Sequence, residues 1–222
     1  MGYRWNDILG DTARAVYRRA RSDLHEGREM KLSEHFQLKE FTDRPMELLT
    51  PIQLYMLRNL CSVLECIRTF LSQELEQPVP MKVSSGIRLP SDINRLRKAG
   101  YNPSETSDHL FGNIVKLRSK VKIKMYGKYY TYSVGACDIV PLCGAEEAFN
   151  LMIPHFNRQT GEVNLPGGTI RVGQIILEKR NTFWLHISNP PELMYSDQLV
   201  AQYFNRKHFL KSLDNGGSYV NV

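Results

Sequence analysis

The strongest structural signal in the sequence is a long amphipathic helix that begins after Thr50. Thr50 is a favourable N-cap residue, Pro51 suits the first helical position, and Gln53 completes a capping box. Apolar residues then recur with helical spacing as far as about Gln73, and Pro78 stops the pattern. The sequence therefore predicts one long helix in a chain of 222 residues, which is large enough to bury a substantial core.

The other periodic segments fall into separate helical and extended blocks. Strands are expected at 81–86 and in hairpins between 162 and 188, and further helices at about 93–99, 145–156 and 197–213. Segregated helices and antiparallel strands are typical of an α+β domain. We therefore expect an α+β fold with a small central antiparallel sheet, helices packed on that sheet, and an inserted basic β-hairpin.

The hairpin is predicted from a strict alternation. Residues 116–124 alternate between basic and uncharged side chains, which indicates a half-buried strand with one basic face. A tight turn at Tyr126 and Gly127 would place Ile123 opposite Tyr130, and the resulting register is consistent on both faces. The hairpin would also carry the chain back on itself, so that the segments before and after it lie close together.

The inserted hairpin, at about residues 113–134, accounts for the basic character of the chain. It contains six basic residues and no acidic one, and the remaining 23 basic residues equal the 23 acidic residues in number. Its lysines are interpreted as protection of a strand edge, as a contact for a polyanion, or as a contact for an acidic neighbouring subunit. Nucleic acid is the weaker partner, because no recognisable nucleic-acid-binding module accompanies the charge.

Residues 1–30 are predicted to form an amphipathic helical extension ahead of a main domain at 31–222. Six arginines in the extension are nearly balanced by five acidic residues, which favours a packing or docking helix over contact with nucleic acid or a membrane surface. No apolar run approaches the ~20 residues needed to span a bilayer, and no signal peptide is recognisable. We therefore expect synthesis in the cytoplasm.

Three separated side chains carry the clearest chemistry. His109, Asp138 and His186 occur in that order, each in or beside a strand-like apolar run. Zinc in hydrolytic sites takes three nitrogen or oxygen ligands of this kind and leaves a fourth position for water. The four cysteines include no Cys-x-x-Cys pair and are interpreted as free thiols.

The local motifs around these residues resemble one known family. They are Ser-x-His-x-x-Gly at 107–112, Gly-x-x-Asp-Ile at 135–139 and Trp-x-His-Ile-Ser at 184–188, supported by Leu-Ser-Glu-His-Phe at 32–36 and by 83–91. In this order they resemble the zinc peptidases related to D-alanyl-D-alanine carboxypeptidases and L-alanyl-D-glutamate endopeptidases, which cut peptidoglycan stem peptides and include bacteriophage endolysins.

The resemblance implies a peptidase-like domain over 31–222 with Zn²⁺ held by His109, Asp138 and His186. It further implies that Arg88 points into the site, where its planar guanidinium would stabilise an oxyanion or hold a substrate carboxylate. The substrate would be a peptidoglycan peptide, met at the bacterial cell wall after release from the host cytoplasm or after carriage in a phage particle.

The general base is where the sequence departs from the family. Several members place an acid three residues before the last histidine, but this position is Phe183 here, so the nearest candidate is Glu178. A two-residue turn after Glu178 would leave it three or four rungs from His186, roughly 10–13 Å away. A five-residue loop would instead pair Glu178 with Trp184 and bring it to roughly 7–8 Å from His186.

Two functions therefore follow from the sequence. The ordered ligand set favours an enzyme, a zinc-dependent peptidase acting on peptidoglycan stem peptides. Phe183, the hairpin at 113–134 and the extension at 1–30 favour the alternative, a catalytically silent structural or binding protein on the same fold. In that alternative the hairpin and the extension would contact other subunits of a virus particle.

Overall fold

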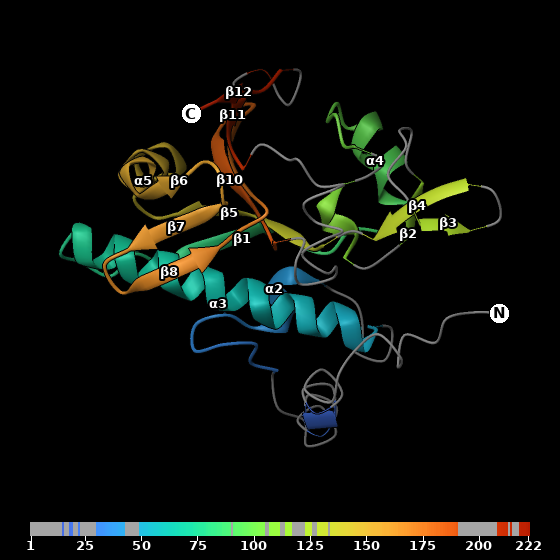
Figure 1. The fold of residues 1–222 in the computed structure, drawn as a ribbon, viewed down its shortest axis with the longest axis horizontal. Coiled ribbons are helices and arrows are strands. Elements are labelled where there is room, and N and C mark those ends of the chain that lie inside the picture. Colours follow the sequence, from blue (N-terminus) through green and yellow to red (C-terminus); the bar gives the residue numbers. More distant parts are fainter. Residues whose placement is uncertain are drawn as a thin grey trace.

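The structure is a computed structural model, and it contains three β-sheets with helices against them (Figure 1). It describes residues 15, 18–19, 22, 30–42, 49–89, 91–104, 107–111, 114–116, 123–125, 128–132, 134–190, 208–212, 214 and 218–222. Nearly all of the predicted extension at 1–30 lies outside these residues, so the helix expected there stays a prediction. No helix within the described part of the chain is both long and apolar enough to cross a bilayer.

The largest sheet has six strands in the order β1-β5-β10-β9-β11-β12. They are β1 (Met81–Ser85), β5 (Ala136–Pro141), β10 (Phe183–Ser188), β9 (Gln174–Lys179), β11 (Phe209–Ser212) and β12 (Val220–Asn221). All neighbours are antiparallel except β9 and β11, which pair in parallel. The predicted α+β class is confirmed, but the central sheet is mixed where we expected a purely antiparallel one.

The prediction of a helix at 197–213 is wrong for part of this range. Residues Phe209–Ser212 form strand β11, and most of the remaining segment lies outside the described residues. The physical reason is a tertiary contact. β11 pairs in parallel with β9, where Phe209 lies beside Ile175 and Leu210 beside Ile176, and Phe209 and Leu210 are buried. Pairing with an existing sheet edge thus overrides the local periodicity.

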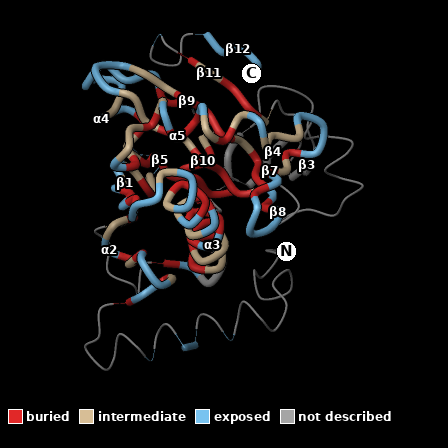
Figure 2. The backbone as a smooth tube through the Cα atoms, turned by 90° about the vertical axis from the view of Figure 1, so that its left-hand side faces the viewer, coloured by how far each residue is buried: buried red, intermediate tan, exposed pale blue. Residues whose placement is uncertain are grey.

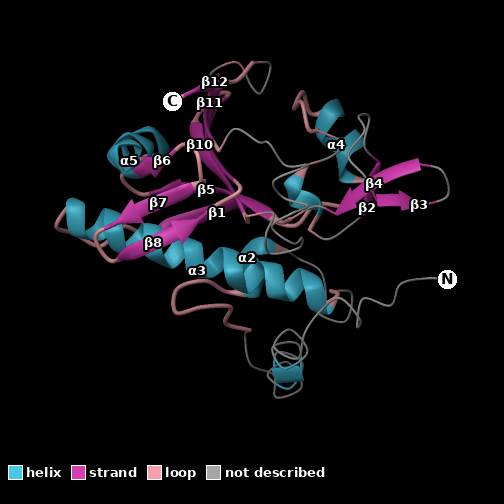
Figure 3. Ribbon diagram, viewed as in Figure 1, coloured by secondary structure: helices cyan, strands magenta, loops and turns pink. Residues whose placement is uncertain are grey.

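Two small sheets complete the fold. One has the order β2-β4-β3, with β2 at Ile114–Lys116, β4 at Lys128–Tyr132 and β3 at Ile123–Met125, and it is a separate group of arrows in Figure 3. The other has the order β6-β7-β8, with β6 at Phe156–Asn157, β7 at Glu162–Leu165 and β8 at Gly168–Arg171.

The inserted segment is therefore more than a two-stranded hairpin, and the single strand expected at 116–124 is wrong, because Lys116 of β2 and Ile123 of β3 both lie opposite Tyr130, on the two edges of β4. The predicted pairing of Ile123 with Tyr130 is confirmed, but β2 also pairs with β4, and Ile114 lies opposite Tyr132. The orientation of the basic side chains in this segment lies outside what the structure describes, so the proposed roles of their charge stay predictions.

The helices follow the sequence signals closely. α3 spans Pro51–Glu74, and Thr50 and Gln53 form the predicted capping box. The other helical elements are α2 (Leu38–Phe41), α4 (Asp92–Lys98), α5 (Ala145–Met152) and the 3₁₀ turns η3 (Asp108–Leu110) and η4 (Ile153–His155). α5 is shorter than predicted, because the chain changes to 3₁₀ geometry at Ile153-Pro154, where proline cannot continue the α-helical hydrogen bonds.

The central sheet separates a core from a cavity. Because side chains alternate along a strand, Cys137 and Ile139 of β5 and Leu185 and Ile187 of β10 all point to one face, where they join the core with α3 and α5. Figure 2 shows this burial concentrated around α3 and the central strands. The intervening side chains, among them Asp138 and His186, face the other side of the sheet, which lines an open cavity of about 920 Å³.

Candidate metal centre

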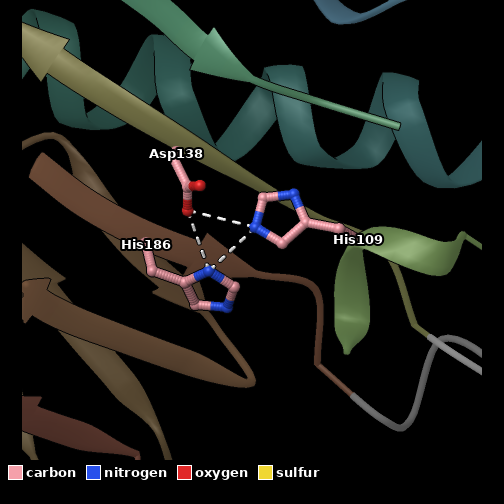
Figure 4. Close-up of side chains that lie close together, drawn as sticks. All are labelled: His109, Asp138 and His186. Atoms are coloured by element: carbon pink, nitrogen blue, oxygen red, sulfur yellow. Dashed lines mark hydrogen bonds and ion pairs between the residues drawn. The ribbon is translucent and has the colours of Figure 1, made fainter. Parts of the chain in front are cut away.

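Two adjacent strands and one short turn bring the three predicted ligands together. Asp138 in β5 lies directly opposite His186 in β10, so their side chains project side by side from the same face of the sheet. His109 lies in the 3₁₀ turn η3, which is capped by Ser107, whose hydroxyl accepts a hydrogen bond from the His109 backbone N–H at 3.4 Å. The three side chains converge on one point at the wall of the cavity (Figure 4).

The three donor atoms form an almost equilateral triangle. His109 Nε2 lies 3.0 Å from Asp138 Oδ1 and 3.1 Å from His186 Nδ1, and these last two atoms are 3.1 Å apart. Donor atoms around a tetrahedral zinc with bonds of about 2.0 Å are separated by about 3.3 Å. The triangle is close to that size, so this buried His109–Asp138–His186 group could bind a metal ion.

A backbone carbonyl fixes which nitrogen of His109 is available. His109 Nδ1 lies 2.8 Å from the carbonyl oxygen of Gly86. Since a carbonyl oxygen only accepts hydrogen bonds, Nδ1 carries the proton and donates it, and the Nε2 lone pair is left facing Asp138 and His186. This arrangement of a second hydrogen bond behind the ring is common among histidines that bind metals.

Gly86 itself is fixed by close packing. A Cβ atom at this position would lie 2.3 Å from the carbonyl oxygen of Phe41, so only glycine fits. The next residue, Ile87, donates its backbone N–H to the same Phe41 oxygen at 2.8 Å. Gly86 directly follows the irregular end of β1, where the register with β5 shifts between Val83 and Ser85. Local irregularities of this kind re-aim the chain next to functional sites.

Burial and mutual contact perturb all three ligands. Burial lowers the pKa of His109, which favours the neutral ring that a metal requires. Burial would raise the pKa of Asp138, but the adjacent His109 and His186 outweigh it and hold that pKa well below its usual value. Burial opposes the charged form of His186 as well, yet the hydrogen bond and charge of Asp138 raise its pKa. Without a metal, His186 therefore holds its proton more tightly than a free histidine.

Arg88 reaches the site, as the resemblance implied. Its Nη2 donates to Asp138 Oδ2 at 2.8 Å, and Nε and Nη2 both donate to Ser85 Oγ at 3.1 and 2.9 Å. Its backbone N–H also donates to the carbonyl oxygen of His109 at 2.8 Å. Arg88 thus holds one carboxylate oxygen of Asp138 and leaves the other oxygen to face the two histidines.

Glu178 stands where the longer-loop arrangement places it. Trp184 pairs with Glu178 and His186 pairs with Ile176, so Glu178 is the diagonal neighbour of His186 on the cavity face. Of the two pairings that the sequence left open, the structure has the one between Glu178 and Trp184. Phe183 lies on the opposite face of β10 and packs against the core, so a carboxylate at that position would be directed away from the cavity.

The environment of Glu178 suits a proton acceptor. Burial raises its pKa, and the charge of His186 and the hydroxyl of Tyr219, which donates to Glu178 Oε1 at 3.1 Å, act in the opposite direction. The indole N–H of Trp184 also favours the charged carboxylate, although its geometry falls short of a hydrogen bond. A carboxylate with a raised pKa is better able to take a proton near neutral pH.

Two contributions were missed by the sequence reasoning. Tyr219 lies in a C-terminal segment to which the sequence reasoning gave no role, and Asp214 organises this segment by accepting hydrogen bonds from the backbone N–H and hydroxyl of Ser218 and from the hydroxyl of Ser212. Ser85, which anchors Arg88, was recognised only as part of a motif. The signal available for the segment of Tyr219 was Asp214, because aspartate favours local turns. No local signal marks Ser85.

Comparisons with known proteins do not identify the chain: no protein-family model, no curated protein and no solved structure matches it. The family resemblance therefore depends on the motifs and on the geometry that joins them.

Proposed function

We propose that this protein is a zinc-dependent peptidase that hydrolyses peptide bonds in peptidoglycan stem peptides. The observation that carries the proposal is the convergence of His109, Asp138 and His186 at the wall of an open cavity, with Glu178 one diagonal step away on the same sheet face. The peptide substrate is inferred from the resemblance of the motifs to murein peptidases.

The chemistry of the donor set supports a bound cation. His109 uses its Nδ1 proton for Gly86, so its Nε2 lone pair faces the lone pairs of Asp138 Oδ1 at 3.0 Å. Protonation of Nε2 would relieve the repulsion between these lone pairs, but burial lowers the pKa of His109 and so opposes that protonation. A cation between the two acceptors removes the conflict, and two imidazoles with one carboxylate form a ligand set that suits zinc.

In the proposed reaction the chain's own groups position the reactants and move protons. Zinc, when bound in such a site, supplies Lewis acidity that polarises a carbonyl and lowers the pKa of water. Glu178 takes the proton from the attacking water at its carboxylate and later returns it to the nitrogen of the leaving amine. Tyr219 holds Glu178 in place through its 3.1 Å hydrogen bond. Arg88 keeps the Asp138 carboxylate in its orientation.

The test is hydrolysis of purified peptidoglycan by the zinc-loaded protein, followed as the release of new amino termini. We expect activity that is lost with a chelator and restored by zinc. Glu178→Gln should lower kcat by about 10²–10⁴-fold because it removes the proton acceptor. The matched control is Glu147→Gln, an exposed glutamate of α5, which should leave kcat unchanged.

A second candidate is a silent structural or binding protein on the same fold, and the observation that favours it is the separate sheet β2-β4-β3, which is inserted between His109 and Asp138. Its partners would be other subunits of a virus particle, contacted through the segments 1–30 and 113–134. Bound zinc without any release of amino termini would favour this candidate over the peptidase.

A further inference from the structure

Arg180 lies on the wall of the cavity, in the turn that joins β9 to β10. Its Nη2 donates to the backbone carbonyl oxygen of Ala99 at 3.1 Å, and its guanidinium carbon lies 4.3 Å from the centre of the Tyr101 ring. Both partners are uncharged, and within the described part of the chain no carboxylate forms an ion pair with Arg180. Among the described residues, the positive charge of Arg180 is therefore left without a neutralising carboxylate.

The exposed guanidinium of Arg180 rests on two neighbouring groups. A Cβ atom on Gly100 would lie 2.8 Å from Arg180 Nη2, so the absence of a side chain at Gly100 leaves room for the guanidinium. Tyr101 supports one of its faces and the Ala99 carbonyl engages one of its edges. A planar guanidinium supported in this way suits bidentate binding of a carboxylate.

Arg180 differs in this respect from Arg88, the arginine that contacts Asp138 of the metal centre. Arg88 uses its N–H groups for Asp138 and Ser85, at distances of 2.8 to 3.1 Å. Much of its capacity to bind an anion is thus already taken up within the site. Arg180 makes no such bond to an acidic group in the part of the chain that the structure describes, so it is the better candidate for a substrate anion.

The strand register sets the spacing between the backbone at His186 and the backbone at Arg180. Ile176 pairs with His186, and Arg180 follows Ile176 by four residues along β9 and its turn. Four residues of extended chain span roughly 13 Å, and a substrate peptide in extended form covers that length with three to four residues. A group bound at Arg180 is therefore remote from the bond that lies at the metal.

We propose that Arg180, seated on Tyr101 and the Ala99 carbonyl, binds a carboxylate of the peptide substrate three to four residues from the bond that is cleaved. This inference rests on the proposed peptidase function and narrows its substrate. It favours internal cleavage of an acidic peptide over removal of a single terminal residue, whose carboxylate would lie beside the metal.

The experiment measures peptide binding by calorimetry in the zinc-supplied Glu178→Gln protein, where turnover is blocked. The probes are the pentapeptide L-Ala-γ-D-Glu-L-Lys-D-Ala-D-Ala with a free C-terminal carboxylate and the same peptide with a C-terminal carboxamide. The free carboxylate lies four residues beyond the alanyl-glutamate bond. We expect the acid to bind about 10- to 100-fold more tightly than the amide, as for a hydrogen-bonded charge pair.

Substitution of Arg180 then tests the assignment. In Arg180→Met the acid should bind as weakly as the amide. Equal weakening of both peptides by Arg180→Met, or equal binding of both by the parent protein, would overturn the inference. Binding is measured without turnover, so a wild-type protein that hydrolyses nothing refutes the peptidase proposal without deciding the subsite.

Discussion

Zinc should stabilise the protein against heat, and His186 should be necessary for this. A ligand that binds only the folded state at 100 times its Kd adds about 2.7 kcal/mol to the free energy of unfolding. For a chain of 222 residues this corresponds to a rise in Tm of about 5–11 °C. His186→Ala removes one corner of the donor triangle, so the rise should almost vanish. The matched control is His155→Ala, because His155 contacts the Asn164 carbonyl and the Phe70 ring and is not one of the three ligands, so this variant should keep the full rise.

The stability of the metal-free protein should depend on pH through His186. The pKa of His186 is raised in the metal-free protein, where Asp138 favours the charged ring. A raised pKa stabilises the fold below the unfolded value of about 6.5, and that contribution is lost as the pH rises through the folded value. The Tm of the metal-free protein should therefore fall relative to that of His186→Ala above about pH 6.5.

Zinc competes with the proton of His186, so the stabilisation by zinc should grow as the pH rises. When the pH lies below the pKa that His186 has in the folded protein, each further unit by which the pH is lowered should raise the Kd of zinc about tenfold. This corresponds to about 1.4 kcal/mol of binding free energy. Scanning calorimetry at pH 6 and pH 8, with zinc or with chelator, measures both trends. An equal rise in Tm in wild type and His186→Ala, or no rise in wild type at either pH, would refute the reasoning and leave the cluster as a hydrogen-bond network.

Two further substitutions test how the site is held. Gly86→Ala should lower the free energy of unfolding by roughly 2 kcal/mol or more, because its Cβ would collide with the Phe41 carbonyl oxygen. Gly167→Ala, where nothing lies within 4 Å of the added carbon, is the control and should change stability little in a denaturant titration. Tyr219→Phe removes a hydrogen bond that favours charged Glu178, so the acid limb of the profile of kcat/KM against pH should move to higher pH. An unchanged profile would mean that Tyr219 does not act on Glu178.

Local chemistry in the sequence was sufficient for several features. The capping box at Thr50 and the following periodicity predicted α3, because caps and amphipathic faces depend on residues within a few positions of each other. The ligand residues His109, Asp138 and His186 were recognised from motifs of five or six residues, and the structure brings them together. In each case the information lies within a short stretch of chain.

Other features depended on pairing between distant segments. The sequence left two registers open for Glu178, and only the observed pairing with Trp184 directs it to the cavity face. The parallel strand β11, the carbonyl of Gly86 behind His109 and the hydroxyl of Tyr219 on Glu178 likewise arise from contacts across the fold. Backbone carbonyls have no residue identity, and a strand's pairing partner is set by the whole sheet, so these contacts leave no pattern in the local sequence. The sequence by itself thus determined the ligand types and the main helix, and the tertiary structure decided how those ligands are oriented and which acid accompanies them.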